Sequence, residues 1–368
     1  MISDSAYMAM ALGLAKEGLF RTSPNPRVGC VIVDDAGQVI GRGSTQAAGE
    51  AHAEIMALQD AREHGFSSEG ATAYVTLEPC AHQGRTGPCC DALAEAGVAR
   101  VVASITDPNP VVAGQGFQKL AARGVALSVG LEAEPSRELN IGFFSRMIRK
   151  RPWIRMKSAA SLDGITALHT GESQWITSPL ARADGHAWRA RACAVLTGIG
   201  TVLADDPRLD VREVNTSRQP SLILVDSRLR VPLDAALFRP ERRVFIYTAV
   251  RNPEKEALLA SRGVTVLHFP DLSGRVDLSA MCFDLARLQL NEVHVEAGSQ
   301  LNGAMLQAGL VDEILLYLAP KLLGSGLGIA HRLETSSLAD ADGLTFHSIG
   351  LVGPDLRVVA RLSGHDEF

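Results

Sequence analysis

Residues 50–90 hold the pattern that says most about the first half of this chain. They include His52-Ala53-Glu54 and, further on, Pro79-Cys80-Ala81-His82-Gln83-Gly84-Arg85-Thr86-Gly87-Pro88-Cys89-Cys90. One imidazole and two thiols can hold a zinc ion and leave the fourth tetrahedral position open. A carboxylate two residues beyond the histidine can then move protons for a zinc-bound water. The pattern predicts a metal centre with ligands His52, Cys80 and Cys89, and Glu54 as the proton carrier.

The predicted secondary structure places His52, Cys80 and Cys89 at the ends of helices and strands. A helix is expected to begin at Ala53, a strand to end just before Pro79-Cys80, and a second helix to begin at Cys89. A helix N-terminus favours a thiolate because its backbone N–H groups point at the sulfur. The expected fold therefore supports metal binding at this pattern.

Hydrolytic deamination of an aminopyrimidine is the chemistry that the pattern favours. Zinc nucleobase deaminases carry His-x-Glu followed by Pro-Cys-x-x-Cys, whereas here eight residues separate Cys80 from Cys89. Glu54 would take a proton from the water and deliver it to the leaving amino group. The alternatives are that no metal is bound, or that the zinc is structural with Cys90 as fourth ligand. Because Cys90 follows Cys89 directly, it would point about 100° away on a helix, and we expect it to be packed.

Helices and strands alternate through the first half, which predicts an α/β domain. The chain has 368 residues, and this length favours two domains. Arg149-Lys150-Arg151-Pro152 is a short basic connection, so we expect domains at 1–148 and 149–368. In the first we expect Ile55, Met56 and Leu58 to face inward from helix 53–64. The other elements expected there are helices 3–19, 89–96, 116–122 and 134–148, and strands 28–33, 38–43, 73–77, 100–105 and 125–129.

The second half is also predicted to be α/β, with a mixed sheet because its last two strands are adjacent and can pair. Residues 296–303 and 197–201 are predicted glycine-bearing loops, which can present backbone N–H groups to phosphates. An ordinary strand–helix turn is the alternative for residues 296–303, and the two loops together favour an extended ligand with phosphates. The expected strands are 153–160, 194–197, 221–225, 243–248, 264–269, 292–296, 311–318, 344–349 and 356–362, and the helices 180–192, 253–261, 278–290 and 304–308.

Composition and charge narrow the class of protein. The net charge of −5 opposes a general nucleic-acid-binding surface. Six cysteines in so long a chain do not form a disulfide framework. No opening stretch reads as a signal peptide, and no apolar run reaches the roughly 18–20 residues that span a bilayer. We expect a cytoplasmic protein with reduced thiols and neither a nucleic-acid nor a membrane partner.

Both halves resemble the bifunctional deaminase/reductase family of riboflavin biosynthesis. The deaminase half is similar at residues 25–30, 52–54 and 79–89, and the reductase half at 157–164, 171–177, 198–206, 225–227 and 295–303. The resemblance covers nearly the whole chain in the same domain order. One departure is Gly87, where the family usually has a second proline before Pro88.

The resemblance implies a cytidine-deaminase-like domain followed by a dihydrofolate-reductase-like domain, with Zn²⁺ and NADPH as cofactors. In the first domain it assigns Asn25 to the pyrimidine, and substrate binding to the inter-cysteine segment that contains His82. The alternative for Asn25 is a turn residue between two prolines.

In the second domain the resemblance assigns one set of residues to the dinucleotide and another to the substrate. Lys157 and Glu296 are expected to orient the sugar near C1′, the alternative being a simple ion pair. Trp175 could instead belong to the core, and Arg189 and Arg212 could be surface residues. The dinucleotide set is Ala159, Trp175, Thr201, Asp205, Ser227, Gly298, Ser299, Gln300, Leu301, Asn302 and Gly303; the substrate set is Ser173, Arg189, Leu209, Arg212 and Glu296.

The implied function has two steps on a pyrimidine ribonucleotide 5′-phosphate. The first is deamination of 2,5-diamino-6-(5-phosphoribosylamino)pyrimidin-4-one, and the second is NADPH-dependent reduction of the ribosyl group to ribityl. The resemblance also favours a homo-oligomer, a dimer or tetramer. Two alternatives are a nucleic-acid deaminase with an accessory domain, and a zinc-stapled binding protein whose second domain senses NADPH.

Overall fold

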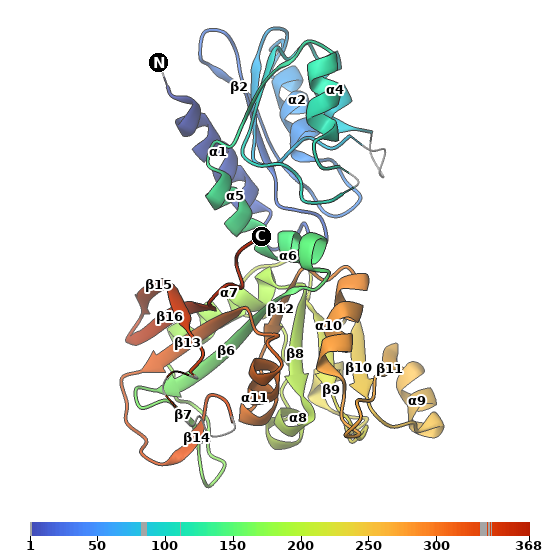
Figure 1. Ribbon diagram of the computed structural model, residues 1–368, viewed down its shortest axis with the longest axis vertical. Coiled ribbons are helices and arrows are strands. Elements are labelled where there is room, and N and C mark those ends of the chain that lie inside the picture. Colours follow the sequence, from blue (N-terminus) through green and yellow to red (C-terminus); the bar gives the residue numbers. More distant parts are fainter. Residues whose placement is uncertain (1, 82–86, 111, 332–336, 338, 340) are drawn as a thin grey trace. The chain divides into compact units, whose positions relative to one another are not determined.

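The computed structural model describes residues 2–81, 87–110, 112–331, 337, 339 and 341–368. The chain divides into two compact units, residues 1–150 and 151–368 (Figure 1).

The first unit is a five-stranded sheet in the order β2-β1-β3-β4-β5, in which β2 and β3 flank β1 antiparallel and the remaining pairs are parallel. Helix α1 lies on one face, and α2 and α4 lie on the other (Figure 1). The elements are α1 (Asp4–Glu17), β1 (Gly29–Val33), β2 (Val39–Ser44), α2 (Ala53–Glu63), β3 (Thr72–Val75), α3 (Cys89–Glu95), β4 (Arg100–Ala103), α4 (Gln115–Ala122), β5 (Ala126–Val129), α5 (Ala133–Leu139) and α6 (Ile141–Arg149).

The helix predicted over 134–148 is two helices, α5 and α6, which meet at Asn140. The Asn140 side chain accepts a hydrogen bond from the backbone nitrogen of Arg27 at 2.7 Å and donates one to its carbonyl oxygen at 2.9 Å. Pairing with a distant backbone holds Asn140 at φ −115°, outside helical geometry. A local pattern could not reveal this, because Arg27 lies far away in the sequence.

Helix α2 approaches strand β2 very closely because two glycines face it. A Cβ on Gly41 would lie 2.2 Å from the carbonyl oxygen of Ala57, and one on Gly43 would lie 2.2 Å from that of Ala53. Only residues without a side chain allow this approach. The contact fixes the first turn of α2 against the sheet, and this turn carries the predicted catalytic carboxylate.

The buried face of α2 differs in part from the prediction. Leu58 is buried as expected, but Ile55 and Met56 are only half-buried, so their inward assignment is wrong. The close approach of the sheet favours small side chains on the inner face, and large ones are displaced to the flanks. The buried residues of α2 are Ala53, Glu54, Ala57, Leu58 and Ala61.

The second unit is built on a nine-stranded mixed sheet, in the order β11-β10-β9-β8-β12-β6-β13-β16-β15. The pairs of β16 with β13 and β15 are antiparallel and the others are parallel. The predicted mixed sheet and the pairing of its last two strands are confirmed. Its strands are β6 (Trp153–Ser161), β8 (Ala194–Gly198), β9 (Ser221–Val225), β10 (Val244–Thr248), β11 (Val264–His268), β12 (Glu292–Val295), β13 (Glu313–Ala319), β15 (Leu344–Val352) and β16 (Asp355–Leu362).

Helices cover both faces of this sheet. Strand residues alternate between two cores: Leu196 packs with helices α10 and α11, whereas its neighbour Val195 packs with α8 and α9. The short strands β7 (Ile165–Leu168) and β14 (Gly326–Gly328) form a separate antiparallel pair that was not predicted. The helices are α7 (Pro179–Arg191), α8 (Ile199–Asp205), α9 (Pro253–Ala260), α10 (Leu278–Arg287) and α11 (Ser299–Gln307), with a 3₁₀ turn η1 at Ala236–Phe238.

The two predicted glycine-bearing loops are largely helical. Strand β8 runs to Gly198 and α8 starts at the next residue, whereas α11 starts at Ser299 rather than at Ala304. Gly198 and Gly298 are the extended N-cap residues of these helices. Glycine near a strand end predicts a loop, but here it marks where a helix starts.

Candidate active sites

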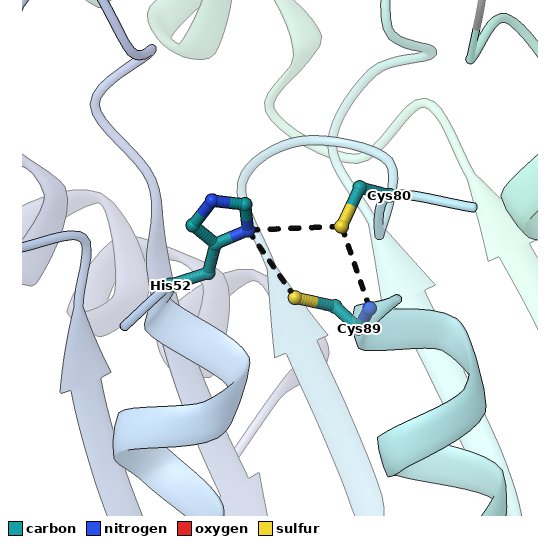
Figure 2. A group of neighbouring side chains, drawn as sticks. All are labelled: His52, Cys80 and Cys89. Atoms are coloured by element: carbon teal, nitrogen blue, oxygen red, sulfur yellow. Dashed lines mark hydrogen bonds between the residues drawn. The ribbon is translucent and has the colours of Figure 1, made fainter. Parts of the chain in front are cut away.

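Three side chains from three elements of the first unit converge at one point (Figure 2). His52 is the N-cap of α2, Cys80 follows β3, and Cys89 is the first residue of α3. Their ligand atoms all lie within 4.8 Å of one another. The Nδ1 atom of His52 is 3.6 Å from the sulfur of Cys80 and 3.4 Å from that of Cys89. The structure thus brings the three predicted ligands together, while Cys90 is buried outside the group.

The two thiols differ in their readiness to lose a proton. A hydrogen bond from the Cys89 side chain, and another with His52, lower the pKa of Cys80 to about 4. Donation to the Cys80 sulfur, together with burial, raises the pKa of Cys89. A second thiolate beside the first is costly unless a cation offsets the charge. One imidazole and two thiols in this geometry fit zinc, a tetrahedral ion that favours nitrogen and sulfur ligands.

Glu54 lies beside this cluster and is almost fully buried, with 3% of its surface exposed. Burial, and then the charge of Cys80, raise the pKa of Glu54 to about 7. A carboxyl group with a pKa near neutrality can both accept and release a proton under ordinary conditions. Its position in the first turn of α2 keeps it two residues from His52 and next to the metal ligands.

A small cavity of about 50 Å³ opens onto the cluster and is lined by His52, Glu54 and Cys80. Asn25, predicted to contact the pyrimidine, also lines it. His82, the other predicted substrate residue of this half, lies outside the described residues. The cavity therefore brings together two of the predicted metal ligands, the predicted proton carrier and one amide side chain.

Two buried carboxyl groups beside the cluster were missed from the sequence. Glu78 accepts hydrogen bonds from the backbone nitrogens of Asp107 at 3.2 Å, Gly114 at 2.9 Å and Gly116 at 2.9 Å. Burial raises the pKa of Asp107 to about 7. The sequence signal for Glu78 was its position directly before Pro79-Cys80. The backbone that it holds is distant in sequence, so this role could not be predicted.

The second unit contains a cavity of about 1250 Å³ at the carboxyl ends of β8, β9 and β12. After β8 the chain moves to β9 on one side, and after β12 it moves to β13 on the other. In open α/β sheets, ligands bind where the strand order changes direction in this way. Helices α8 and α11 both begin here, and the N-terminus of a helix attracts phosphate.

Nearly all predicted residues of the second half line this cavity. Trp175 is 62% exposed there, so the alternative that it belongs to the core is wrong. Gly303 is the exception: a Cβ on it would lie 1.8 Å from the carbonyl oxygen of His331, so it allows close backbone packing. The lining includes Lys157, Ala159, Ser173, Trp175, Arg189, Thr201, Asp205, Leu209, Arg212, Ser227, Glu296, Gly298, Ser299, Gln300, Leu301 and Asn302.

Glu296 is the centre of a charge cluster inside the cavity. Arg189 binds its carboxylate with Nε and Nη2, the latter at 2.8 Å, and the Nζ atom of Lys157 lies 4.0 Å away. Burial opposes the charge on Glu296, but Arg189 outweighs it, so the pKa of this carboxyl lies well below its usual value. Burial lowers the pKa of Lys157. Lys157 and Glu296 can form this ion pair and also orient the sugar, because both side chains line the cavity.

The predicted substrate arginines are held by carboxylates rather than lying free on the surface. Arg189 also donates Nη1 to the carbonyl oxygen of Asp210 at 3.0 Å. Arg212 donates to a carboxylate oxygen of Asp210 at 2.8 Å, and Arg208 lies 2.7 Å from the other. Arg212 and Arg208 are about half exposed, so each has donors left for a ligand.

Several residues that line the cavity were missed from the sequence. Arg182 stacks on Trp175, with its guanidinium carbon 4.5 Å from the ring centroid. His186 lies one helical turn before Arg189 on α7, a spacing that could have indicated a shared face. Arg208, Arg230 and Arg275 also line the cavity. Isolated arginines outside any motif gave no signal.

Comparisons with known proteins agree with both halves. Residues 1–105 match the family described as the cytidine and deoxycytidylate deaminase zinc-binding region, and residues 152–348 match the RibD C-terminal domain. The riboflavin biosynthesis protein RibD of Escherichia coli strain K12 is 47% identical over 364 residues, which cover 96% of this chain and 98% of that protein.

Solved structures show the same similarity over the whole chain. Acinetobacter baumannii RibD, form 1, superposes with a TM-score of 0.88 at 40% identity, covering 98% of this chain and 99% of that one. A Thermotoga maritima diaminohydroxyphosphoribosylaminopyrimidine deaminase/5-amino-6-(5-phosphoribosylamino)uracil reductase gives a TM-score of 0.87 at 32% identity, with 98% of each chain covered.

The fold and the sites define a zinc-type deaminase domain followed by a reductase domain, and the predicted fold class is confirmed. The chain belongs to the RibD family and is a bifunctional deaminase/reductase of riboflavin biosynthesis, as the resemblance implied. Among the described residues, no helix is both long and apolar enough to cross a membrane.

Proposed function

We propose that the first unit deaminates 2,5-diamino-6-(5-phosphoribosylamino)pyrimidin-4-one with water, releasing ammonia. The observation that carries this proposal is the His52–Cys80–Cys89 cluster beside the buried carboxyl of Glu54. Zinc held by these three residues would supply hydroxide near neutral pH by acidifying a water molecule. Glu54 takes the proton from that water and passes it to the departing amino group. Asn25 binds the pyrimidine, and we assign His82 to the same substrate.

The second unit then reduces the ribosyl group of 5-amino-6-(5-phosphoribosylamino)uracil to ribityl. The cofactor NADPH supplies a hydride to C1′. Lys157 and Glu296 orient the sugar, and Ser173, Leu209 and Arg212 bind the rest of the substrate beside Arg189. The residues that would hold the dinucleotide are Ala159, Trp175, Thr201, Asp205, Ser227 and residues 298–302, all of which line the cavity. Two helix N-termini next to one another support a site for its diphosphate.

The choice of NADPH over NADH is supported by two arginines of the cavity lining. Arg230 and Arg275 are exposed and line it together with Ser227, which accepts a hydrogen bond from the backbone of Val276 at 3.1 Å. Guanidinium groups bind a phosphate monoester such as the 2′-phosphate with high affinity. We expect Arg275→Gln to raise the KM for NADPH about tenfold and to change the KM for NADH little. Arg228→Gln is the matched control, since Arg228 is exposed but lies outside the lining.

Glu54→Gln tests the assignment of the first reaction. The variant should bind one zinc ion per chain, yet release ammonia from the diaminopyrimidine nucleotide at least about 1000 times more slowly, because proton transfer is lost. Cofactor oxidation with the deaminated nucleotide should continue. Zinc content is measured by atomic absorption, and ammonia and NADPH are followed separately. Unchanged ammonia release would rule out the proposed role of Glu54.

We also propose that the protein is a homo-oligomer, a dimer or tetramer. Strand β15 is an edge of the sheet, and Phe346, Ile349 and Leu351 on it are exposed. An exposed apolar edge strand is suited to pairing with another chain. Sedimentation velocity should give an oligomer that Leu351→Lys weakens; a monomer at micromolar concentration would contradict the proposal. The cytoplasmic location stays a prediction, which cell fractionation tests.

A further inference from the structure

His186 occupies a part of the reductase cavity to which the preceding assignments give no role. It lies on α7, lines the cavity, and is 5% exposed. Its Nδ1 atom accepts a hydrogen bond from the backbone nitrogen of Arg212 at 3.3 Å. Because Nδ1 accepts, the ring proton of the neutral imidazole must be on Nε2. Within the described part of the chain, Nε2 has no hydrogen-bond partner.

The surroundings of His186 favour an anion. The charges of two arginines and two carboxylates act on the ring, and two further arginines lie near one of these carboxylates. The wider cluster therefore holds four guanidinium groups and two acidic residues. Two of the four are partly exposed and retain free donors, whereas the others are engaged by carboxylates or backbone carbonyls. The groups are Arg189, Arg208, Arg212 and Arg242, with Asp210 and Glu296.

The ring itself adds no charge to this cluster. Burial, followed by the charges of Arg189 and Arg212, lowers the pKa of His186 to about 4. The imidazole is therefore neutral near pH 7, and it offers a single N–H donor at a fixed position. A donor held in place by a backbone contact loses little conformational entropy when a ligand binds.

We propose that His186 is a further substrate-binding residue, whose Nε2–H donates a hydrogen bond to the phosphate of the phosphoribosyl group. This inference rests on the proposed function of the reductase cavity. The phosphate would lie between the imidazole and the free donors of Arg208 and Arg212. A purely structural role, in which His186 only supports the backbone of Arg212, is the competing explanation.

Two substitutions separate these roles, because each preserves the hydrogen-bonding group of one ring nitrogen. Glutamine places an amide N–H near the position of Nε2, whereas asparagine places an acceptor near that of Nδ1. H186N should weaken the binding of D-ribose 5-phosphate about tenfold or more, since a hydrogen bond to a charged group is lost. H186Q should weaken it by less than about threefold. Calorimetry on the full chain measures both, and ammonia release by the same molecules verifies that the chain is intact.

The binding of D-ribose and steady-state kinetics complete the test. The large difference between H186N and H186Q should disappear with D-ribose, and in kinetics it should appear in the KM for the nucleotide rather than in kcat. The inference would be overturned if H186Q lost more affinity for D-ribose 5-phosphate than H186N, or if both variants bound it equally. It would also be overturned if H186N weakened the binding of D-ribose as much as that of D-ribose 5-phosphate. If the unmodified protein bound D-ribose 5-phosphate but did not oxidise NADPH with the nucleotide, the proposed reduction would fail while the inference about His186 stood.

Discussion

The deaminase and reductase sites of this chain differ in how they compensate buried charge. At the first site, two thiols, an imidazole and Glu54 meet, no Lys or Arg among the described residues lines the cavity beside them, and the pKa of Glu54 rises to about 7. At the second, Arg189 and Lys157 neutralise Glu296, whose pKa falls well below its usual value. We therefore expect a metal ion to offset the charge at the first site, whereas side chains of this chain offset it at the second.

Removing the metal is the strongest test of this difference. A chelator, or Cys89→Ala, should lower ammonia release at least about 1000-fold, because the ion contributes several kcal/mol to the transition state. NADPH oxidation with the deaminated nucleotide should remain within about twofold. Both rates are measured on the same sample before and after treatment.

Cys90→Ala is the matched control for that experiment. Cys90 is buried next to Cys89 but lies outside the group of ligand atoms, so zinc content should be retained. Restoring zinc after chelation should restore ammonia release. Loss of NADPH oxidation on chelation would show that the second site also depends on the metal, and the contrast between the two sites would be wrong.

The same difference explains what the sequence could predict. The metal cluster comes from short motifs, so the spacing of His52, Glu54, Cys80 and Cys89 was enough to predict that they converge. The reductase residues were assigned by resemblance, and nearly all of them line one cavity. The sequence offered for His186 only its helical spacing from Arg189, because its proposed role depends on the backbone of Arg212, which α7 approaches only in the folded protein.

Fold predictions failed where distant contacts decide the local structure. The break at Asn140 depends on Arg27, and the inner face of α2 depends on two glycines in β2. The helix start at Ser299 is not predicted, because glycines such as Gly298 and Gly303 favour a loop. Gly303 is helical, and it is required where the backbone of His331 approaches.

Gly43→Ala tests whether the first site depends on the fit of α2 against the sheet. The new Cβ would lie 2.2 Å from the carbonyl oxygen of Ala53, so the first turn of α2 must shift. A displacement of about 1 Å at a catalytic group can cost about 100-fold in rate, and overpacking costs about 1–3 kcal/mol of stability. Ammonia release should fall accordingly, and NADPH oxidation should not.

Gly13→Ala is the control substitution in the same unit. A Cβ on Gly13 meets nothing within 4 Å, and Gly13 lies in the interior of α1. Alanine there should raise the melting temperature slightly, because it favours helix by about 1 kcal/mol over glycine. Equal effects of the two substitutions on ammonia release would exclude a special role for the glycine contact.

The smallest expected effect concerns the pH dependence of the second unit. The pKa of His186 falls from 6.5 to about 4 on folding, so between these values only the unfolded chain is protonated there. Its contribution to stability is therefore present above pH 6.5 and is lost as the pH falls towards 4. H186Q has no group at this position that takes up a proton. Its free energy of unfolding relative to that of the unmodified protein should therefore rise as the pH falls from 7 to 5, by on the order of 1 kcal/mol. Urea midpoints at the two pH values measure the change, and groups common to both proteins cancel. A difference that stays constant from pH 7 to pH 5 would mean that the arginines around His186 do not keep it neutral, and that the cavity is less positive than its side chains imply.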